Sequence, residues 1–518
     1  MIQIDGNNLT LDEIVRVARH FEPVEIAPGA IPVIHRSRAL LDSIVATDRP
    51  VYGINTGFGI FAEQRIHRRE ASALSRNLIL SHAVGTGEPL PGEVVRAAML
   101  VRANTLAKGH SGVRIEIIQT LLDMLNLHVT PVVPSQGSLG SSGDLLPLSH
   151  MALVFTTDEL DREEDSGLAD YQGQVMTGKA AMRQAGIPRI RLGPKEGLAV
   201  NNGATFSAAI AALAVLDAES LVDIANAALA MSLEAVLGCS SAFDPRVHVA
   251  RGHTGQMRVA RNVLALTEGS DLLDAAGRIQ DAYSLRCAPQ VNGAALDTLQ
   301  FVRSVIEHEV NAATDNPLLF EDGQVISGGN FHGEPVGMVM DYLAIALCEV
   351  GAISERRIFR LTDGKLNGGL PPMLVDHPDA AGLNSGLMMP QYTAASLVLE
   401  NQTLATPDSV HSLPTSGEQE DHNANSMTAA RHARQVLINT AHVLAIELYT
   451  AARALDLRLR QSPEKHMGAR TSQVFALLRT RVPYQAGDAW WGPEIETVKQ
   501  MILTGEFTPL VAFEIKEP

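Results

Sequence analysis

Residues 204–237 read ATFSAAIAALAVLDAESLVDIANAALAMSLEAVL, and this stretch decides the fold class. Apolar side chains recur every three or four residues from Phe206 through Leu221 to Met231, which is the spacing of an α-helix. Alanine and other small residues cover the remaining faces, so we expect this helix to pack against other helices on more than one side. The stretch predicts a mainly α-helical protein.

Two later segments, residues 338–361 and 427–457, repeat this behaviour, and together the three segments indicate a bundle of long helices. Upstream of them the pattern is more mixed, with glycine-rich loops between shorter helices; the first helix starts at a capping box. We therefore expect three parts: a mixed N-terminal region (1–203), a central long-helix bundle (204–460) and a C-terminal helical cap (461–518).

The composition of the 518 residues excludes several classes of partner. The net charge is −17 at pH 7, whereas a nucleic-acid-binding surface is basic. Acidic residues interrupt 204–237, the richest apolar stretch, so we find no membrane span of about 20 residues. Three well-separated cysteines fit a reducing cytosol, and no His, Cys or Asp set has metal-ligand spacing. We expect a cytoplasmic protein with no metal, membrane or nucleic-acid partner.

Residues 137–150 read GSLGSSGDLLPLSH, and this second stretch predicts the chemistry. The nitrogen of Gly143 can attack the carbonyl carbon of Ser141 if the turn is compressed, because glycine has no Cβ to obstruct the approach. Loss of two waters, one of them from Ser142, would leave a methylidene-imidazolone ring, a strong electrophile. At this point an ordinary turn or a phosphate-binding loop is equally compatible with the stretch.

Polar and aromatic residues interrupt the helical pattern at a few further places. Tyr52, in a glycine-rich loop, can serve as a general base if its neighbours lower its pKa, although a packed loop tyrosine is the simpler interpretation. His82 ends a helix, where histidine is more often structural. Gln280, Tyr283 and Arg286 share a face if their segment is helical. An arginine fork is the preferred clamp for a carboxylate.

Taken together, these segments resemble the aromatic amino-acid ammonia-lyase family, which includes histidine, phenylalanine and tyrosine ammonia-lyases and 2,3-aminomutases. The matching motifs, in the family's order from Tyr52 to Met388 and His422, are YGINTGFG, NLILSHAVGTG, GSLGSSGDLLPLSH, EGLAVNNGAT, QDAYSLRCAPQV, TDNPLL, GGNFHGEP, LNSGLM and QEDH. The resemblance implies the fumarase-like fold, a homotetramer with a central helical bundle and active sites shared by three subunits. It also implies a methylidene-imidazolone made autocatalytically from Ser141, Ser142 and Gly143.

The same resemblance implies the roles of individual residues in binding and converting an amino acid. Ser142 supplies the methylene carbon, Tyr52 removes a β-proton, and Glu420 meets the amino group or assists proton transfer. Tyr283 is placed with the catalytic residues and hydrogen-bonds the ring oxygen or the substrate. The residues implied in substrate binding are His82, Asn202, Gln280, Arg286 for the carboxylate, Phe331 against the ring, and Met388.

Two positions indicate the substrate. The pair Ser81-His82 and Glu420 in QEDH resemble the histidine lyases, which favours L-histidine and its products trans-urocanate and ammonia. A tyrosine or other arylalanine lyase and a 2,3-aminomutase on the same scaffold stay open. From another class, so does a catalytically silent helical scaffold. The sequence departs from the family pattern at Asn201 and Ala204, at Ser141, where alanine is usual, and in an enlargement at residues 423–425.

Overall fold

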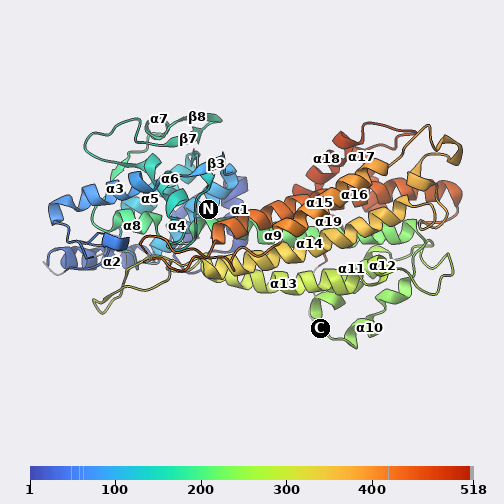
Figure 1. Cartoon of the computed structure of the whole chain (residues 1–518), viewed down its shortest axis with the longest axis horizontal. Coiled ribbons are helices and arrows are strands. Elements are labelled where there is room, and N and C mark those ends of the chain that lie inside the picture. The colour runs from blue at the N-terminus through green and yellow to red at the C-terminus, as the bar shows by residue number, and fades with distance from the viewer. Residues whose placement is uncertain (48–49, 58, 62, 418, 514–518) are drawn as a thin grey trace. The chain divides into compact units, whose positions relative to one another are not determined.

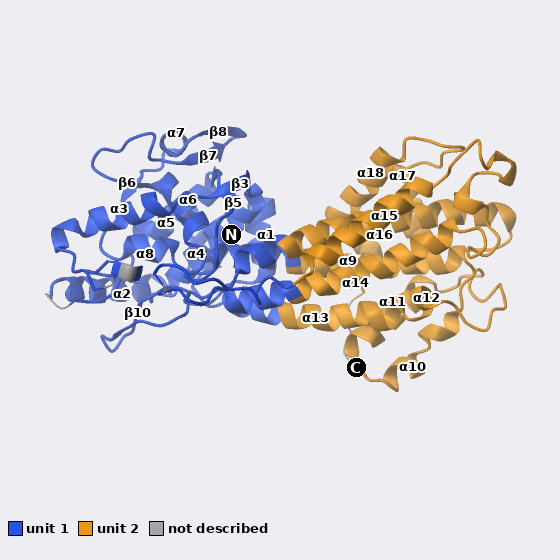
Figure 2. Cartoon of the chain, in the orientation of Figure 1, with its two compact units in different colours: residues 1–214, 303–341, 407–431 blue, residues 215–302, 342–406, 432–518 orange. Residues whose placement is uncertain are grey.

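The computed structural model describes residues 1–47, 50–57, 59–61, 63–417 and 419–513, and they are mainly helical (Figure 1). The prediction of a mainly α fold is confirmed. The chain forms two compact units (Figure 2). Unit 1 comprises residues 1–214, 303–341 and 407–431, and unit 2 comprises residues 215–302, 342–406 and 432–518. The division at residues 203 and 460 stays a prediction.

Long helices dominate the second half of the chain, as the apolar periodicity predicts. They are α9 (Thr205–Ala235), α13 (Ala288–Glu309), α14 (Glu334–Thr362), α15 (Met388–Leu404) and α16 (Ser426–Gln461). Within unit 2 a buried carboxylate, Glu447 on α16, joins three of them. It pairs with Arg357 on α14 through two contacts of 2.5 and 2.7 Å, and it accepts hydrogen bonds from the Ser232 and Ser354 hydroxyls.

The remaining helices of unit 2 are shorter: α10 (Pro245–Val249), α11 (Thr254–Leu266), α12 (Tyr283–Arg286), α17 (Ala469–Arg481), α18 (Trp491–Leu503) and α19 (Thr508–Val511). The helix α14, not the segment 204–237, carries the most membrane-like apolar window among the described residues. Because 67% of that window is buried inside the protein, its apolar character is accounted for by packing.

Unit 1 contains the shorter helices of the N-terminal half. They are α1 (Leu11–His20), α2 (Ile31–Val45), α3 (Ala71–His82), α4 (Gly92–Ala107), α5 (Ile115–Asn126), α6 (Leu145–Phe155), α7 (Gly178–Gln184) and α8 (Glu196–Asn201). The capping box at the start of α1 is present, with the Thr10 hydroxyl accepting from Glu13 N and the Glu13 carboxylate accepting from Thr10 N. The helix α4 is buried almost all round.

The strands are short and form small separate sheets. Parallel pairs join β1 (Ile2–Ile4) to β2 (Val24–Ile26) and β6 (Thr156–Thr157) to β9 (Ile190–Arg191). Antiparallel pairs join β3 (Thr86–Pro89) to β5 (Pro134–Gln136) and β10 (Leu318–Leu319) to β11 (Val325–Ile326). A three-stranded sheet has the order β4 (Val129–Pro131), β7 (Leu168–Tyr171), β8 (Gln174–Thr177). The 3-10 turns are Gly59–Phe61, Arg68–Glu70, Ser240–Phe243, Pro372–Leu374 and Pro378–Ala380.

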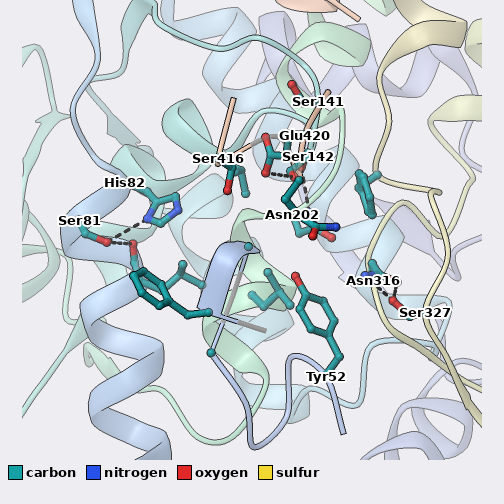
Figure 3. Close-up of a pocket in the computed structure, with 18 of the residues that line it drawn as sticks. Tyr52, Ser81, His82, Ser141, Ser142, Asn202, Asn316, Ser327, Ser416 and Glu420 are labelled. Carbon is teal, nitrogen blue, oxygen red and sulfur yellow. Dashed lines mark hydrogen bonds between the residues drawn. The ribbon is translucent and has the colours of Figure 1, made fainter. Parts of the chain in front are cut away.

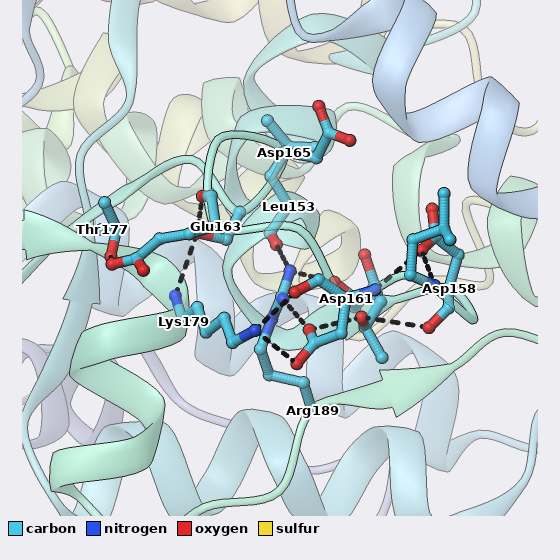
Figure 4. A network of polar contacts seen from close by, with 12 residues as sticks. Leu153, Asp158, Asp161, Glu163, Asp165, Thr177, Lys179 and Arg189 are labelled. Atoms are coloured by element: carbon cyan, nitrogen blue, oxygen red, sulfur yellow. Dashed lines mark hydrogen bonds and ion pairs between the residues drawn. The ribbon is translucent and has the colours of Figure 1, made fainter.

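The acidic segment before the β7–β8 hairpin is held by ion pairs (Figure 4). Asp161 receives Arg189 at 2.5 Å, Lys179 at 3.0 Å and the Thr157 hydroxyl at 2.6 Å. The hydrogen bond from Thr157 and the two nearby cations lower the pKa of Asp161. A run of acids that composition predicts to be a solvated surface excursion is therefore partly anchored to the sheet beneath it.

Candidate active site

A cavity of about 1200 Å³ lies within unit 1, and seven of the predicted site residues line it (Figure 3). They come from segments far apart in the chain: Tyr52, His82, Ser141, Ser142, Asn202, Phe331 and Glu420. Figure 3 shows Tyr52, His82 and Asn202 on different walls with Ser142 and Glu420 adjacent to one another. The fold thus brings together most of the predicted site residues, including Phe331 and Glu420 from later in the chain.

The peptide from Ser141 to Gly143 is sharply folded, with Gly143 directly behind the lining of the cavity. Gly143 has φ +74°, and a Cβ added there would lie 2.1 Å from the carbonyl carbon of Gly203. Ser141 and Gly143 also form a bridge to each other. Only glycine fits at this position, so the residues present match what self-cyclisation requires.

The carbonyl oxygen of Ser142 accepts two hydrogen bonds from the turn that follows α8. Asn202 Nδ2 donates at 2.9 Å and Gly203 N at 3.2 Å. The second polar atom of the Asn202 amide, Oδ1, is buried and has no partner among the described residues. Donors aimed at one oxygen can stabilise negative charge that develops there.

Glu420 approaches the same peptide from the opposite side. The Ser142 hydroxyl donates to Glu420 Oε1 at 2.9 Å. The backbone of Glu420 is held in turn by reciprocal hydrogen bonds with Thr415, at 2.8 and 3.2 Å. The carboxylate therefore sits on a closed loop beside the one hydroxyl that the predicted cyclisation would remove.

Asp144 is a residue to which the sequence analysis assigned no role. It is fully buried and accepts hydrogen bonds from the Ser138 hydroxyl at 2.9 Å and from the backbone and hydroxyl of Ser207 at 2.8 and 2.9 Å. Burial raises the pKa of Asp144, while the Ser207 and Ser138 hydrogen bonds lower it. The Asp144 carboxyl thereby joins the peptide 141–143 to the first turn of α9. In the sequence, the signal for such a role was its position directly after Ser142 and Gly143.

His82 ends α3 and is held by its neighbour. Ser81 Oγ donates to the Leu78 carbonyl at 3.2 Å and lies 2.9 Å from His82 Nδ1. When the Ser81 hydroxyl donates to the Leu78 carbonyl, Nδ1 carries the proton of the His82–Ser81 contact and Nε2 is the acceptor atom of the ring. Burial lowers the pKa of His82, so the imidazole is neutral near pH 7.

Tyr52 points into the cavity but lacks the environment predicted for a base (Figure 3). Burial, and to a smaller degree the charge of Glu420, raise the pKa of its hydroxyl, whereas a backbone contact with Gly59 lowers it. The residue lies in a turn, in keeping with the glycine-rich loop expected from the sequence. Within one chain the neighbours of Tyr52 therefore favour the protonated hydroxyl.

Four predicted residues do not line this cavity and belong to unit 2: Gln280, Tyr283, Arg286 and Met388. The helix α12 begins only at Tyr283, so Gln280 precedes it and does not share a helical face with the other two. Arg286 donates through Nε to the Asp281 carbonyl and stacks 4.7 Å over the Tyr283 ring. Tyr283 is 70% exposed.

The lining of the cavity also limits what it can hold. Among the residues the structure describes, no lysine or arginine lines it, and no group of three or more His, Cys, Asp or Glu side chains could hold a metal ion. Carboxylates are present instead, from Glu420 and Asp421. A lysine or arginine that binds a substrate carboxylate here would come from outside the described residues that line the cavity.

The sequence matches the aromatic amino acid lyase family over residues 9–480. The chain belongs to that family. A curated histidine ammonia-lyase from Caldanaerobacter subterraneus subsp. tengcongensis is 49% identical over 484 residues, which cover 93% of this chain and 92% of the relative. The histidine ammonia-lyase structure from Trypanosoma cruzi has a TM-score of 0.89 at 37% identity, covering 100% of this chain and 99% of the other.

The fold is shared across lyases and aminomutases. The structure of tyrosine aminomutase from Streptomyces globisporus has a TM-score of 0.91 at 34% identity and covers 100% of this lyase and 99% of the other chain. The TM-scores of 0.89 and 0.91 do not separate lyase from aminomutase. The sequence identity is 49% to the curated histidine ammonia-lyase and 34% to the tyrosine aminomutase. The chain is therefore a carbon-nitrogen lyase by family, and the shared fold alone does not select its substrate.

Proposed function

We propose that this lyase eliminates ammonia from L-histidine and releases trans-urocanate. The observation that carries the proposal is the near-half identity to curated histidine ammonia-lyases along almost the whole chain. The neutral His82 supports it, because this residue lines the cavity, Nε2 would accept a hydrogen bond, and a histidine ring offers an N–H donor. A tyrosine hydroxyl is also a donor, so His82 alone does not select between the two.

The family uses a methylidene-imidazolone, and residues 141–143 fit its formation. When present, this group supplies an electrophile that takes up electrons while ammonia leaves. Asn202 and Gly203 hold the Ser142 oxygen, which would bear the charge. Glu420, which lines the cavity beside Ser142, would meet the substrate amino group, and Phe331 lines the same cavity. Tyr52 is the residue proposed to take the β-proton, which requires a cation near its hydroxyl to lower the pKa that burial raises.

The missing cation supports an active site shared between chains. The cavity of unit 1 offers carboxylates and amides, whereas Arg286, Tyr283, Gln280 and Met388 lie in unit 2 and outside its lining. A homotetramer in which other subunits bring these residues to each cavity would supply the carboxylate clamp and the charge near Tyr52. The family implies this arrangement. We further propose a cytoplasmic enzyme with no nucleic-acid or membrane partner, in keeping with three free cysteines.

A substrate comparison tests the proposal. Purified enzyme is incubated separately with L-histidine, L-tyrosine and L-phenylalanine, and the ultraviolet spectrum of each product is recorded. Urocanate from histidine is expected. Coumarate from tyrosine, with no urocanate from histidine, would contradict the proposal that histidine is the substrate. A β-amino acid resolved by chromatography would identify an aminomutase.

A mass measurement tests the prosthetic group directly. The tryptic peptide that contains Ser142 is expected to be lighter than its sequence mass by two waters. A peptide at its full mass, together with no turnover of any substrate, would favour the catalytically silent scaffold.

A further inference from the structure

The loop at residues 412–425 binds the self-cyclising peptide at three places in antiparallel order. The contacts are Asn425 N to the Leu139 carbonyl at 2.8 Å, Asn423 Nδ2 to Ser141 Oγ at 2.6 Å, and Ser142 Oγ to Glu420 Oε1 at 2.9 Å. All these residues belong to unit 1. One loop thus holds the peptide at Leu139, Ser141 and Ser142, and the contacts to the two serines each join two side chains.

Both polar atoms of the Asn423 side-chain amide are engaged in this arrangement. Its Oδ1 accepts from Leu413 N at 2.8 Å and its backbone N donates to Ser412 Oγ at 2.9 Å, so its own loop fixes its position. Nδ2 then reaches Ser141. Asn423 is 1% exposed and Ser141 is 5% exposed, and a buried amide that lost this acceptor would leave an N–H without a partner.

Both members of the contact lie at positions where the resemblance to the family implies a departure from the usual pattern. They are Ser141, for which the resemblance implies alanine, and Asn423, the first residue of the implied enlargement after QEDH. An alanine at position 141 could accept no hydrogen bond. The two departures meet in the structure although they are 282 positions apart in the chain, which indicates that they are matched.

The other end of the peptide is fixed independently. Asp144 N donates to the Gly203 carbonyl at 2.8 Å, and Gly143 presses against Gly203. Ring closure joins the nitrogen of Gly143 to the carbonyl carbon of Ser141, so both ends must be held close before the bond forms. The structure shows a contact that holds each end.

We propose that Asn423 is a positioning residue for the cyclisation, holding Ser141 so that its carbonyl carbon lies within reach of Gly143 N. The inference rests on the proposed function. In the reaction the C=O double bond of Ser141 is replaced by a new C–N bond to the Gly143 nitrogen and a C=N double bond to the Ser142 nitrogen. The carbonyl oxygen of Ser141 leaves as water with the amide hydrogens of Gly143 and Ser142. A second water takes the Ser142 hydroxyl and its α-hydrogen. Asn423 is unchanged throughout.

Time-resolved intact mass spectrometry of newly synthesised full-length chain tests this role. Asn423→Ala, Ser141→Ala and the double variant are compared with the wild type, and the appearance of chain lighter by two waters is followed. Each single substitution is expected to slow cyclisation about five- to tenfold, as for the loss of one hydrogen bond. The double variant is expected to be no slower than the slower single variant, because both remove the same contact.

Asn401→Ala is the matched control. It removes a buried asparagine and its hydrogen bond to the Thr440 hydroxyl at 3.2 Å within unit 2, without touching residues 412–425 or 139–143, and it is expected to cyclise within about twofold of the wild-type rate. Melting temperatures of the uncyclised chains separate slow chemistry from poor folding. Where Asn423→Ala fails to fold, Ser141→Ala carries the test, because it leaves the loop's own contacts in place.

Wild-type rates in Ser141→Ala, or effects that multiply in the double variant, would overturn the role of Asn423. A wild-type chain that never loses water contradicts the proposed function itself. The two failures are therefore distinguishable.

Discussion

At the scale of single residues, packing leaves no room for a side chain at Gly143. It has φ +74°, and a Cβ there would overlap the backbone of Gly203 at 2.1 Å. Gly143→Ala is expected to give a chain that stays at its full mass by intact mass spectrometry, because the peptide must shift away from Gly203. Gly173→Ala is the control, since Gly173 has φ +76° with nothing within 4 Å of the added Cβ. Cyclisation in Gly143→Ala at the rate of the control would contradict this account.

The protonation of His82 gives a prediction about pH. Burial lowers its pKa, so the imidazole stays neutral below the ordinary histidine value, and Nε2 stops accepting only once the pH falls through the lowered pKa. We expect the KM for histidine to rise at that acidic limit. The substrate imidazole also titrates, so His82→Gln, which keeps an acceptor that does not ionise, isolates the contribution of the protein. The same acid rise of KM in both enzymes would assign it to the substrate.

A substitution at the same position separates recognition from maturation. His82→Leu removes the acceptor without touching residues 141–143, so we expect histidine turnover to fall at least tenfold while the cyclised fraction stays near that of the wild type. Steady-state kinetics and intact mass measure the two quantities. An equal loss of both would make His82 a structural residue.

The sequence identified single site residues that stand in a local motif. It did not identify contacts between segments that are far apart in the chain. Tyr52, His82, Asn202 and Glu420 each stand in a distinctive motif and do line one cavity. The Asn423–Ser141 contact joins two serine- and asparagine-containing segments that carry no pairing signal, because the fold alone brings them together. The raised pKa of Tyr52 is likewise a consequence of burial, which no local pattern records.

For secondary-structure elements, the length of the element decides how well the spacing of apolar residues predicts it. The helices α9, α14 and α16 span 31, 29 and 36 residues, so many apolar repeats define each one. The helix α12 has 4 residues, less than two turns, and its start at Tyr283 excludes Gln280 from the face it was expected to share. Elements this short are set by their surroundings more than by their own sequence.

The long helices of unit 2 are joined by a buried ion pair whose loss should be measurable. Glu447→Gln keeps the size of the side chain but leaves the buried Arg357 guanidinium without its charge partner. We expect a loss of about 3–5 kcal/mol in the free energy of unfolding, measured by denaturant titration. Glu159→Gln, in an exposed pair with Arg191, is expected to cost less than about 1 kcal/mol. Equal losses would show that Glu447 contributes as a surface charge does.

At the scale of the whole molecule, the distribution of site residues between the two units predicts how chains cooperate. Glu420 lies in unit 1 and lines the cavity, whereas Arg286 lies in unit 2 and does not. If other subunits supply Arg286, Glu420→Gln and Arg286→Ala should each inactivate the homo-oligomer, while co-expressed mixtures should regain activity. Random assembly of equal amounts gives about a quarter of sites with both wild-type residues when these come from different chains, and none when they come from one chain. Steady-state turnover of the mixture, with separately purified and unexchanged variants as the control, distinguishes the two arrangements. Recovery near a quarter requires that the carboxylate clamp cross a subunit boundary, and a mixture as inactive as its components would place the whole site within one chain.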